Sequence, residues 1–269
     1  MTGNEPGYLF DTGDPAERDR LQAHTELWDP FTFRKLAETG VGAGWRCLEI
    51  GAGTGTVAAW LLDRVGRGGQ VVATDIETRW LEPLASANIV VRHHDVAADT
   101  LDEGGYDLIH ARLVLEHLPQ RHAVTTKLAA ALAPGGWLVL EDYDIRTMAL
   151  TDPAHDDWNA VNHAVVDVLR AAGTDPLCGS QLPELLHGTG LVDVTAEGYL
   201  RPLPISALAP VFRPALEGLS EALTRAGAVT AEQVARSLAA FDDPAGTTRT
   251  YTPVLVAATG RQPGAPRRR

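Results

Sequence analysis

The sequence is poor in cysteine. Cys47 and Cys178 are the only two among 269 residues, which excludes a disulfide framework and disfavours a zinc cluster. Cys47 falls within a predicted strand, where a small buried apolar side chain is its expected role. The nine histidines show no spacing typical of metal ligands. We therefore expect no metal site.

Long apolar runs and an excess of basic residues are also missing. No stretch approaches the roughly 18 consecutive apolar residues that span a bilayer, and the first residues lack the basic start and apolar core of an export signal. We therefore expect a cytoplasmic protein without membrane contact. Acidic residues outnumber basic ones by 35 to 23, giving a net charge of -12. This balance disfavours nucleic-acid binding and favours a small-molecule substrate, while the oligomeric state is left open.

One short stretch combines a strand, a glycine turn and a helix. Arg46–Ile50 is predicted as a buried strand, and Val57, Leu61 and Val65 follow at helical spacing. Between them, glycines 51, 53 and 55 permit a tight turn and a close approach of backbone N–H groups to a ligand. The stretch predicts a nucleotide-binding corner, with a glycine-rich turn that binds nothing as the alternative.

An acid at the end of the next strand supports the nucleotide site. Gln70–Ile76 is a short apolar run that contains Asp75, twenty residues after Gly55. In a doubly wound sheet, an acid in this position accepts hydrogen bonds from the ribose hydroxyls. The alternative role of Asp75 is to cap a helix that begins near Glu77, and the two roles are compatible.

The pattern E-x-G-x-G-x-G over 49–55 resembles motif I of the class I S-adenosylmethionine-dependent methyltransferases, and the resemblance continues to about residue 144. It implies S-adenosyl-L-methionine as cofactor and S-adenosyl-L-homocysteine as product. In that family an acid after the third strand binds the adenine amino group, and the next backbone N–H binds a ring nitrogen. The core positions that the resemblance assigns to the cofactor are Glu49, Gly51, Ala52, Gly53, Asp75, Ile76, Asp95, Val96, His110 and Ala111.

The N-terminal segment resembles the helical lid of bacterial, actinobacterial-type natural-product methyltransferases. Two helical patterns separated at Pro30 are predicted between Asp14 and Gly40. By resemblance, Tyr8 and Gln22 contact the methionine part of the cofactor, with a solvated or packed surface position as the alternative for each.

Methyl transfer requires the acceptor atom, methyl carbon and sulfur to lie in line, and it needs a base only if the acceptor carries a proton. His117 is the first candidate base because imidazole titrates near neutrality and because it begins the predicted helix after the fourth strand. The alternative role of His117 is to cap or pack that helix. Asp142 and Tyr143 come at the end of the fifth predicted strand, Gly136–Tyr143, and strand alternation directs one of them toward the site. Arg112 is either a partner of the cofactor's carboxylate or an ion-pair partner of Asp107 or Glu116.

The predicted fold is α/β: a doubly wound, mostly parallel, seven-stranded Rossmann-like methyltransferase sheet with N-terminal helices and a helical lid insertion. Helices are predicted near 54–65, 78–85 and 122–133, and two antiparallel strands at 191–200 and 251–258 complete the sheet. We divide the chain into a lid (1–40), a cofactor-binding core (41–150), a completing segment with substrate-covering helices (151–260) and a disordered tail (261–269).

The predicted function is methyl transfer to an O, N or C atom of a small, partly hydrophobic molecule in secondary metabolism. A nicotinamide-dependent oxidoreductase is the first alternative, disfavoured because Thr56 stands where the dinucleotide fingerprint has its third glycine. The second alternative is a methyltransferase-like protein that binds the cofactor without turnover.

Overall fold

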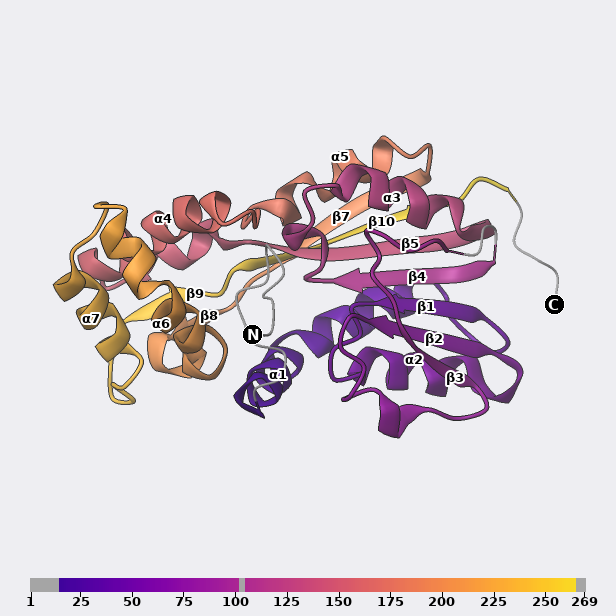
Figure 1. The fold of residues 1–269 in the computed structure, drawn as a ribbon, viewed down its shortest axis with the longest axis horizontal. Helices are drawn as coiled ribbons and strands as arrows, with labels where there is room; N and C mark the ends of the chain where they lie inside the picture. The colour runs from indigo at the N-terminus through magenta and orange to yellow at the C-terminus, as the bar shows by residue number, and fades with distance from the viewer. Residues whose placement is uncertain (1–14, 102–104, 265–269) are drawn as a thin grey trace.

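The computed structural model describes residues 15–101 and 105–264, with side chains from residue 19 onward. A seven-stranded sheet with strand order β3-β2-β1-β4-β5-β10-β7 forms its centre (Figure 1). The strands are β1 (Arg46–Ile50), β2 (Gln70–Asp75), β3 (Ile89–His93), β4 (Tyr106–Arg112), β5 (Leu132–Asp144), β7 (Val192–Tyr199) and β10 (Val254–Arg261). The order reverses between β1 and β4, and ligands of doubly wound sheets bind at such a switch point.

The strand directions confirm the predicted sheet with one correction. β1 to β5 pair in parallel, while β10 pairs antiparallel with both β5 and β7. β7 therefore runs in the same direction as the core strands. We expected the last two strands to be antiparallel to the core, but only β10 is, because it inserts between the other two.

Helices cover both faces of the sheet. On one face, α3 (Arg121–Ala130) and α5 (Leu182–His187) bury Leu128 and Leu185 against the strands. On the other face, α2 (Thr56–Val65) packs Leu61 against the strands beside Leu36, which comes from α1 (Pro15–Glu38). Burial on both faces explains why Cys47–Ile50 of β1 and Val71–Thr74 of β2 are buried without alternation.

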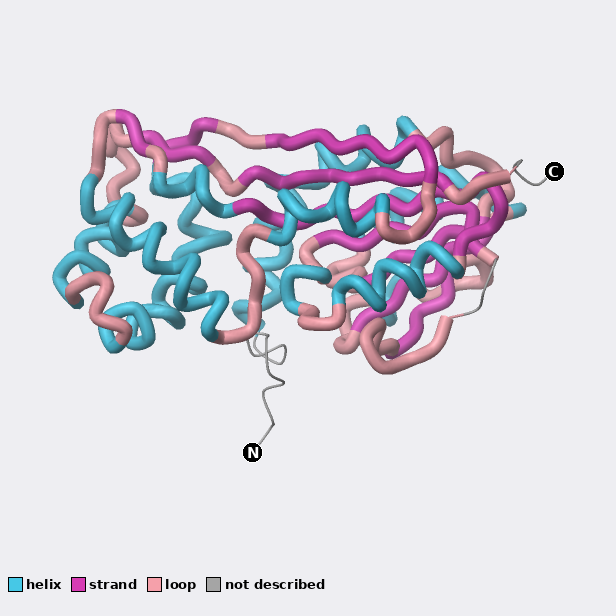
Figure 2. Tube along the Cα trace, turned by 90° about the horizontal axis from the view of Figure 1, so that it is seen from above, coloured by secondary structure: helices cyan, strands magenta, loops and turns pink. Residues whose placement is uncertain are grey.

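A second group of helices lies beyond one end of the sheet, where α4 (Asp156–Ala171), α6 (Ala209–Arg225) and α7 (Ala231–Ala240) pack on one another (Figures 1 and 2). A small sheet of β6 (Thr151–Asp152), β9 (Arg249–Tyr251) and β8 (Pro202–Pro204) joins this group to the large one. The predicted strand 251–258 is therefore two strands. Pro253 lacks the N–H group that a continuous ladder would need, and the chain changes sheets there.

The N-terminal helix α1 is continuous through Pro30, which corrects the predicted break at this residue. A proline removes one helical hydrogen bond, but contacts on both sides hold the helix together. Trp28 is fully buried, and Thr32 is bonded to the sheet. The predicted cap Asp14 lies outside the described residues.

The segment predicted as a helix over 78–85 is mostly irregular. The structure has only the single 3-10 turn η2 (Glu82–Leu84) there. Pro83 removes a backbone donor just where a longer helix would need it, which explains the difference. In the described part of the chain, no helix combines the length and apolar character needed to cross a membrane.

Candidate active site

A cavity of about 410 Å³ opens at the carboxyl ends of the central strands and continues between the helices of the second group. Its first part is bordered by the glycine turn, the end of β2 and the turn after β3. Its second part is bordered by α4, α6 and the turn after β5. The cavity therefore connects the predicted cofactor site to a chamber walled by helices.

The glycine turn holds conformations that other residues avoid. Gly51, Gly53 and Gly55 have φ angles of 65°, 53° and 80°. A Cβ atom on Gly51 would lie 2.5 Å from Val114, and one on Gly55 would lie 2.3 Å from Leu84, whereas a Cβ on Gly53 would meet no atom within 4 Å. Gly53 thus leaves open space beside the cavity, as a cradle for a close-fitting ligand requires.

Asp75 connects the end of β2 to this turn. Its Oδ2 accepts a hydrogen bond of 2.8 Å from the Gly53 N–H, and its Oδ1 accepts one of 3.0 Å from the Glu77 N–H. Burial raises the pKa of Asp75, and these backbone N–H groups act against that rise. The same carboxylate that is predicted to bind the ribose also shapes the turn. The helix that it was expected to cap near Glu77 does not form, and the Glu77 N–H closes a local turn on Asp75 instead. The next residue, Ile76, lines the cavity with 48% of its surface exposed.

The turn after β3 brings two further predicted residues to the cavity. Asp95 and Val96 both line it. The Oδ1 of Asp95 accepts a hydrogen bond of 2.7 Å from the Ala97 N–H, which fixes the carboxylate at the strand end. Together with Glu49 and Ala52, these residues place most of the predicted core cofactor positions around one space.

His110 and Ala111 do not reach this space, which corrects two predicted cofactor contacts. Both are fully buried in β4. His110 pairs in register with Glu49, and its Nδ1 lies 2.8 Å from a Glu49 oxygen while its Nε2 lies 3.3 Å from Glu141 Oε2. Burial alone would lower the pKa of His110, but the two carboxylates outweigh it and raise the pKa to about 9. A histidinium therefore bridges two acids inside the sheet.

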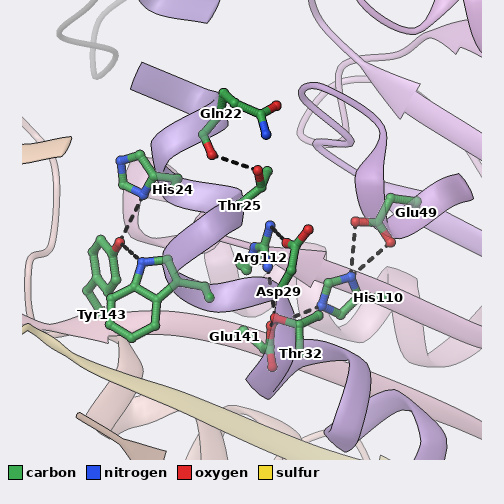
Figure 3. Close-up of polar contacts among 11 residues, drawn as sticks. Gln22, His24, Thr25, Asp29, Thr32, Glu49, His110, Arg112, Glu141 and Tyr143 are labelled. Carbon is green, nitrogen blue, oxygen red and sulfur yellow. Dashed lines mark hydrogen bonds and ion pairs between the residues drawn. The ribbon is translucent and has the colours of Figure 1, made fainter. Parts of the chain in front are cut away.

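The same network attaches α1 to the sheet (Figure 3). Thr32 donates a hydrogen bond of 2.5 Å to Glu141, and Arg112 donates one of 2.8 Å to Thr32. Arg112 also forms an ion pair of 2.9 Å with Asp29, not with either of the two acids predicted as its partners. This clamp, composed of Asp29, Thr32, Arg112 and Glu141, fixes α1 beside the mouth of the cavity.

Tyr143 lines the cavity, as predicted for one of the two residues after the fifth strand. Its hydroxyl accepts a hydrogen bond of 2.7 Å from Trp28 Nε1 and lies 3.0 Å from His24 Nδ1, so two groups of α1 converge on it (Figure 3). Burial raises the pKa of Tyr143, and the acid Glu116 adds to the rise. The phenol is therefore neutral at physiological pH and is unsuited to act as a base.

Asp142 points to the opposite face of β5, and this corrects its prediction as a catalytic group. It is fully buried outside the cavity lining, with Oδ2 3.7 Å from Cys178 Sγ. Burial raises its pKa to about 8, while backbone N–H groups of Glu116 and Leu115 act in the other direction. Asp142 thus lies close to the backbone of the 3-10 turn η3 (Leu115–His117).

The turn η3 carries the remaining candidates for a base. His117 lines the cavity, and its Nε2 lies 3.3 Å from Glu116 Oε1. Glu116 lines the cavity too, and its pKa is raised well above the usual value by burial and by Asp142. The sequence predicts for Glu116 only an ion pair with Arg112, and its position after the fourth strand, next to His117, is the signal that points to a role in the site.

Two N-terminal residues, Gln22 and Tyr8, are predicted to contact the cofactor. Gln22 is exposed and outside the cavity lining, because it lies on the outward side of α1. Its neighbours Arg20, Leu21, His24 and Thr25 line the cavity instead. Tyr8 lies outside the described residues. An N-terminal helix thus borders the cavity, but the residues that face inward are neighbours of Gln22 and not Gln22 itself.

The helical chamber is mainly apolar. The α4 and α6 helices contribute Trp158, Val165, Leu169, Phe212, Ala215 and Leu219. Asn162 is a polar exception, and its Nδ2 donates to the Trp158 carbonyl. Among the described residues, no group of three or more His, Cys, Asp or Glu side chains is arranged to hold a metal ion.

Comparisons with known proteins agree with this geometry. The chain is 29% identical over 217 residues to Methyltransferase str2 of Strobilurus tenacellus, covering 79% of this chain and 76% of that protein. It is 40% identical over 105 residues to a segment of the Hybrid PKS-NRPS synthetase apdA of Emericella nidulans, covering 35% of this chain and 3% of that protein. Phosphoethanolamine N-methyltransferase 2 of Haemonchus contortus, solved in complex with S-adenosyl-L-methionine, has the same fold with a TM-score of 0.55 at 18% identity, over 88% of this chain and 53% of that one.

The family described as Methyltransferase domain matches residues 18–195, more than half of the chain and all of the glycine turn, β2 and β4. S-adenosyl-L-methionine is the methyl donor of this family. This membership decides against the nicotinamide-dependent alternative. The chain belongs to the class I S-adenosylmethionine-dependent methyltransferases.

Proposed function

We propose that this methyltransferase transfers the methyl group to an O, N or C atom of a small, partly hydrophobic molecule in specialised metabolism. The observation that carries the proposal is the continuity of one cavity from the glycine turn to the apolar chamber. A ligand in the chamber would face the cofactor end without crossing solvent. The match to a segment of a Hybrid PKS-NRPS synthetase supports the metabolic context.

The donor end fits S-adenosyl-L-methionine. We assign the ribose to Asp75, the adenine to Asp95 and Val96, and the close backbone approach to Gly51, Ala52 and Gly53. When bound, this cofactor supplies an electrophilic methyl group on a sulfonium centre. Glu49 lines the cavity and is hydrogen-bonded to His110, so its carboxylate is held in one orientation near that positive charge.

The chain's part in the reaction is to align the acceptor, exclude water and remove a proton where the acceptor carries one. We assign proton removal to the pair Glu116 and His117. A carboxyl group with a raised pKa takes up a proton more readily than an ordinary one, and the imidazole beside it offers a second acceptor. Asp142 positions this pair through the backbone of η3.

In this proposal, each of the first three predicted segments of the chain has a separate role. The lid at 1–40 borders the cofactor through α1, and the core at 41–150 holds it. The segment 151–260 supplies the helices that enclose the acceptor.

Isothermal titration calorimetry with S-adenosyl-L-methionine and, separately, NAD tests the donor end. Asp75→Asn is expected to weaken binding of the sulfonium compound by about tenfold or more, because a carboxylate bonded to neutral donors contributes about 1.5–3 kcal/mol. Asp63→Asn, at an exposed position of α2, is the matched control and should bind like the wild type. Binding of NAD in place of the sulfonium compound would refute the assignment.

Turnover separates an enzyme from a protein that binds the cofactor without reacting. Release of S-adenosyl-L-homocysteine is measured with a panel of apolar phenols, amines and enolisable ketones. Glu116→Gln together with His117→Asn should lower turnover of phenols by about 10²-fold or more while leaving cofactor binding unchanged. Unchanged turnover in this variant would remove the pair from the mechanism.

A further inference from the structure

The hydrogen bonds around Tyr143 determine which atoms of its neighbours carry protons. They leave open only the direction of the Tyr143 hydroxyl proton. The Arg20 guanidinium lies 2.7 Å from His24 Nε2, and a guanidinium can only donate. The Nε2 atom must therefore be the acceptor of that bond. Burial and the nearby arginines lower the pKa of His24 well below its usual value, so the ring is neutral and its single proton is on Nδ1.

That proton points to Tyr143. Because Nδ1 is protonated, it donates across the 3.0 Å contact to the Tyr143 hydroxyl oxygen. Trp28 Nε1 is also only a donor, and it donates to the same oxygen at 2.7 Å. A phenol oxygen that accepts two hydrogen bonds has its lone pairs occupied. Among the described residues, no acceptor for the Tyr143 proton is present, and the side chain lines the cavity.

We propose that the Tyr143 hydroxyl is a dedicated hydrogen-bond donor that selects acceptor substrates carrying an uncharged oxygen, a carbonyl or an ether, within the apolar chamber. The inference rests on the proposed function, because it takes the chamber as the acceptor site. Tyr143 is then a specificity-determining residue of that site, held in place by Arg20, His24 and Trp28.

The surroundings favour an uncharged ligand over an anion. Two arginines line the cavity, and both are engaged: Arg112 pairs with Asp29, and Arg20 donates to His24. The chamber beyond Tyr143 is formed by apolar side chains such as Phe212, Leu216 and Trp158. A charged group there would lose its hydration without gaining an unoccupied cation.

The test uses two probes of nearly equal shape, 2-acetylnaphthalene and 2-ethylnaphthalene, with S-adenosyl-L-homocysteine present. Tyr143→Phe should weaken binding of the ketone by about fivefold, the effect of one neutral hydrogen bond, and leave binding of the hydrocarbon unchanged. The carbonyl stretching band of the ketone should shift to lower frequency on binding to the wild type and not on binding to the variant.

A second variant guards against misfolding, because Tyr143→Phe leaves two buried donors without their acceptor. Incorporation of 3-fluorotyrosine at position 143 keeps both accepted bonds and makes the phenol a stronger donor. The carbonyl shift should then be larger than in the wild type. Nitrogen-15 NMR of the His24 ring, with no ligand required, should show a protonated Nδ1 and an unprotonated Nε2.

Other outcomes would refute either the donor role of Tyr143 or the acceptor chamber itself. Equal loss of both probes in Tyr143→Phe, an unshifted carbonyl band, or a proton on His24 Nε2 would refute the donor role while leaving the chamber in place. If neither probe binds while S-adenosyl-L-methionine does, the acceptor chamber of the proposed function fails, and the inference fails with it.

Discussion

The Nδ1 atom of His110 lies 2.8 Å from a carboxylate oxygen of Glu49, and both side chains are almost completely buried. This contact joins β1 to β4 at the point where the strand order reverses, directly below the glycine turn. The charge state of one histidine therefore affects the stability of the sheet at the cofactor site.

Stability should fall in mildly alkaline solution. The pKa of His110 is about 9 in the folded chain and near 6.5 when unfolded, so its stabilising contribution is complete below about pH 6.5. It is lost as the pH rises through 9, by on the order of 3 kcal/mol in total. Urea unfolding from pH 6 to pH 9.5 measures this loss. His110→Gln should reduce the dependence, and His163→Gln, on the exposed side of α4, should retain it. The raised pKa values of Asp142 and Glu116 leave a smaller loss of stability with rising pH in both variants. A wild-type profile that is flat over this range would contradict the assigned charge.

Breaking the clamp should loosen α1. Asp29 and Arg112 have side chains only 13% and 11% exposed, so Asp29→Asn leaves a poorly hydrated charge and should cost about 2 kcal/mol of unfolding free energy. The ion pair between Glu221 and Arg225 is the control, since its side chains are 85% and 70% exposed. Glu221→Gln should leave the urea midpoint unchanged. Equal midpoints for the two variants would show that the clamp contributes nothing.

Gly53 offers a test of the cradle. Gly53→Ala and Gly227→Ala both place a methyl group at a positive φ with no atom within 4 Å, so each should cost about 1 kcal/mol of stability. Only Gly53 lines the cavity. Calorimetry should therefore show about a tenfold loss of S-adenosyl-L-methionine affinity in Gly53→Ala alone, which corresponds to about 1.4 kcal/mol. A similar loss in both variants would mean that backbone strain, not space, determines affinity.

Filling the chamber should separate acceptor binding from donor binding. Ala215→Trp on α6 places an indole in the apolar chamber and should abolish turnover of the largest acceptors while cofactor affinity stays within twofold of the wild type. Ala235→Trp on the exposed side of α7 is the control and should change neither. Loss of cofactor affinity in Ala215→Trp would place the residue at the donor end instead.

Local patterns predicted the glycine turn and the acid beside it well. The strand, turn and acid that involve Gly53 and Asp75 depend on residues close in sequence, and the structure brings them together at 2.8 Å. Alternation along β5 predicted that only one of Asp142 and Tyr143 faces the cavity, but it did not determine which. The answer depends on Trp28, which lies 115 positions away from Tyr143 in the sequence.

The other differences between the predicted and the observed structure also arise from contacts between residues that are distant in the sequence. His110 has the strand-end position of a cofactor ligand, yet two acids from neighbouring strands surround it. Pro30 marks a helix break in sequence terms, yet tertiary contacts of Trp28 and Thr32 outweigh the lost hydrogen bond. Neither effect is visible from neighbours in the chain.

The position of β10 between β5 and β7 has a consequence for how such enzymes diversify. Tyr199 and Leu255 are partners across the β7–β10 ladder, so the chain leaves the sheet and returns to it at adjacent points. Between them lies the segment with β8, α6, α7 and β9, which supplies much of the chamber wall. Because the ends of this segment are adjacent, its length and sequence can vary without a change in the pairing of β7 and β10. Changes within this segment can then alter the chamber wall without displacing Gly53 and Asp75, which lie at the other end of the cavity.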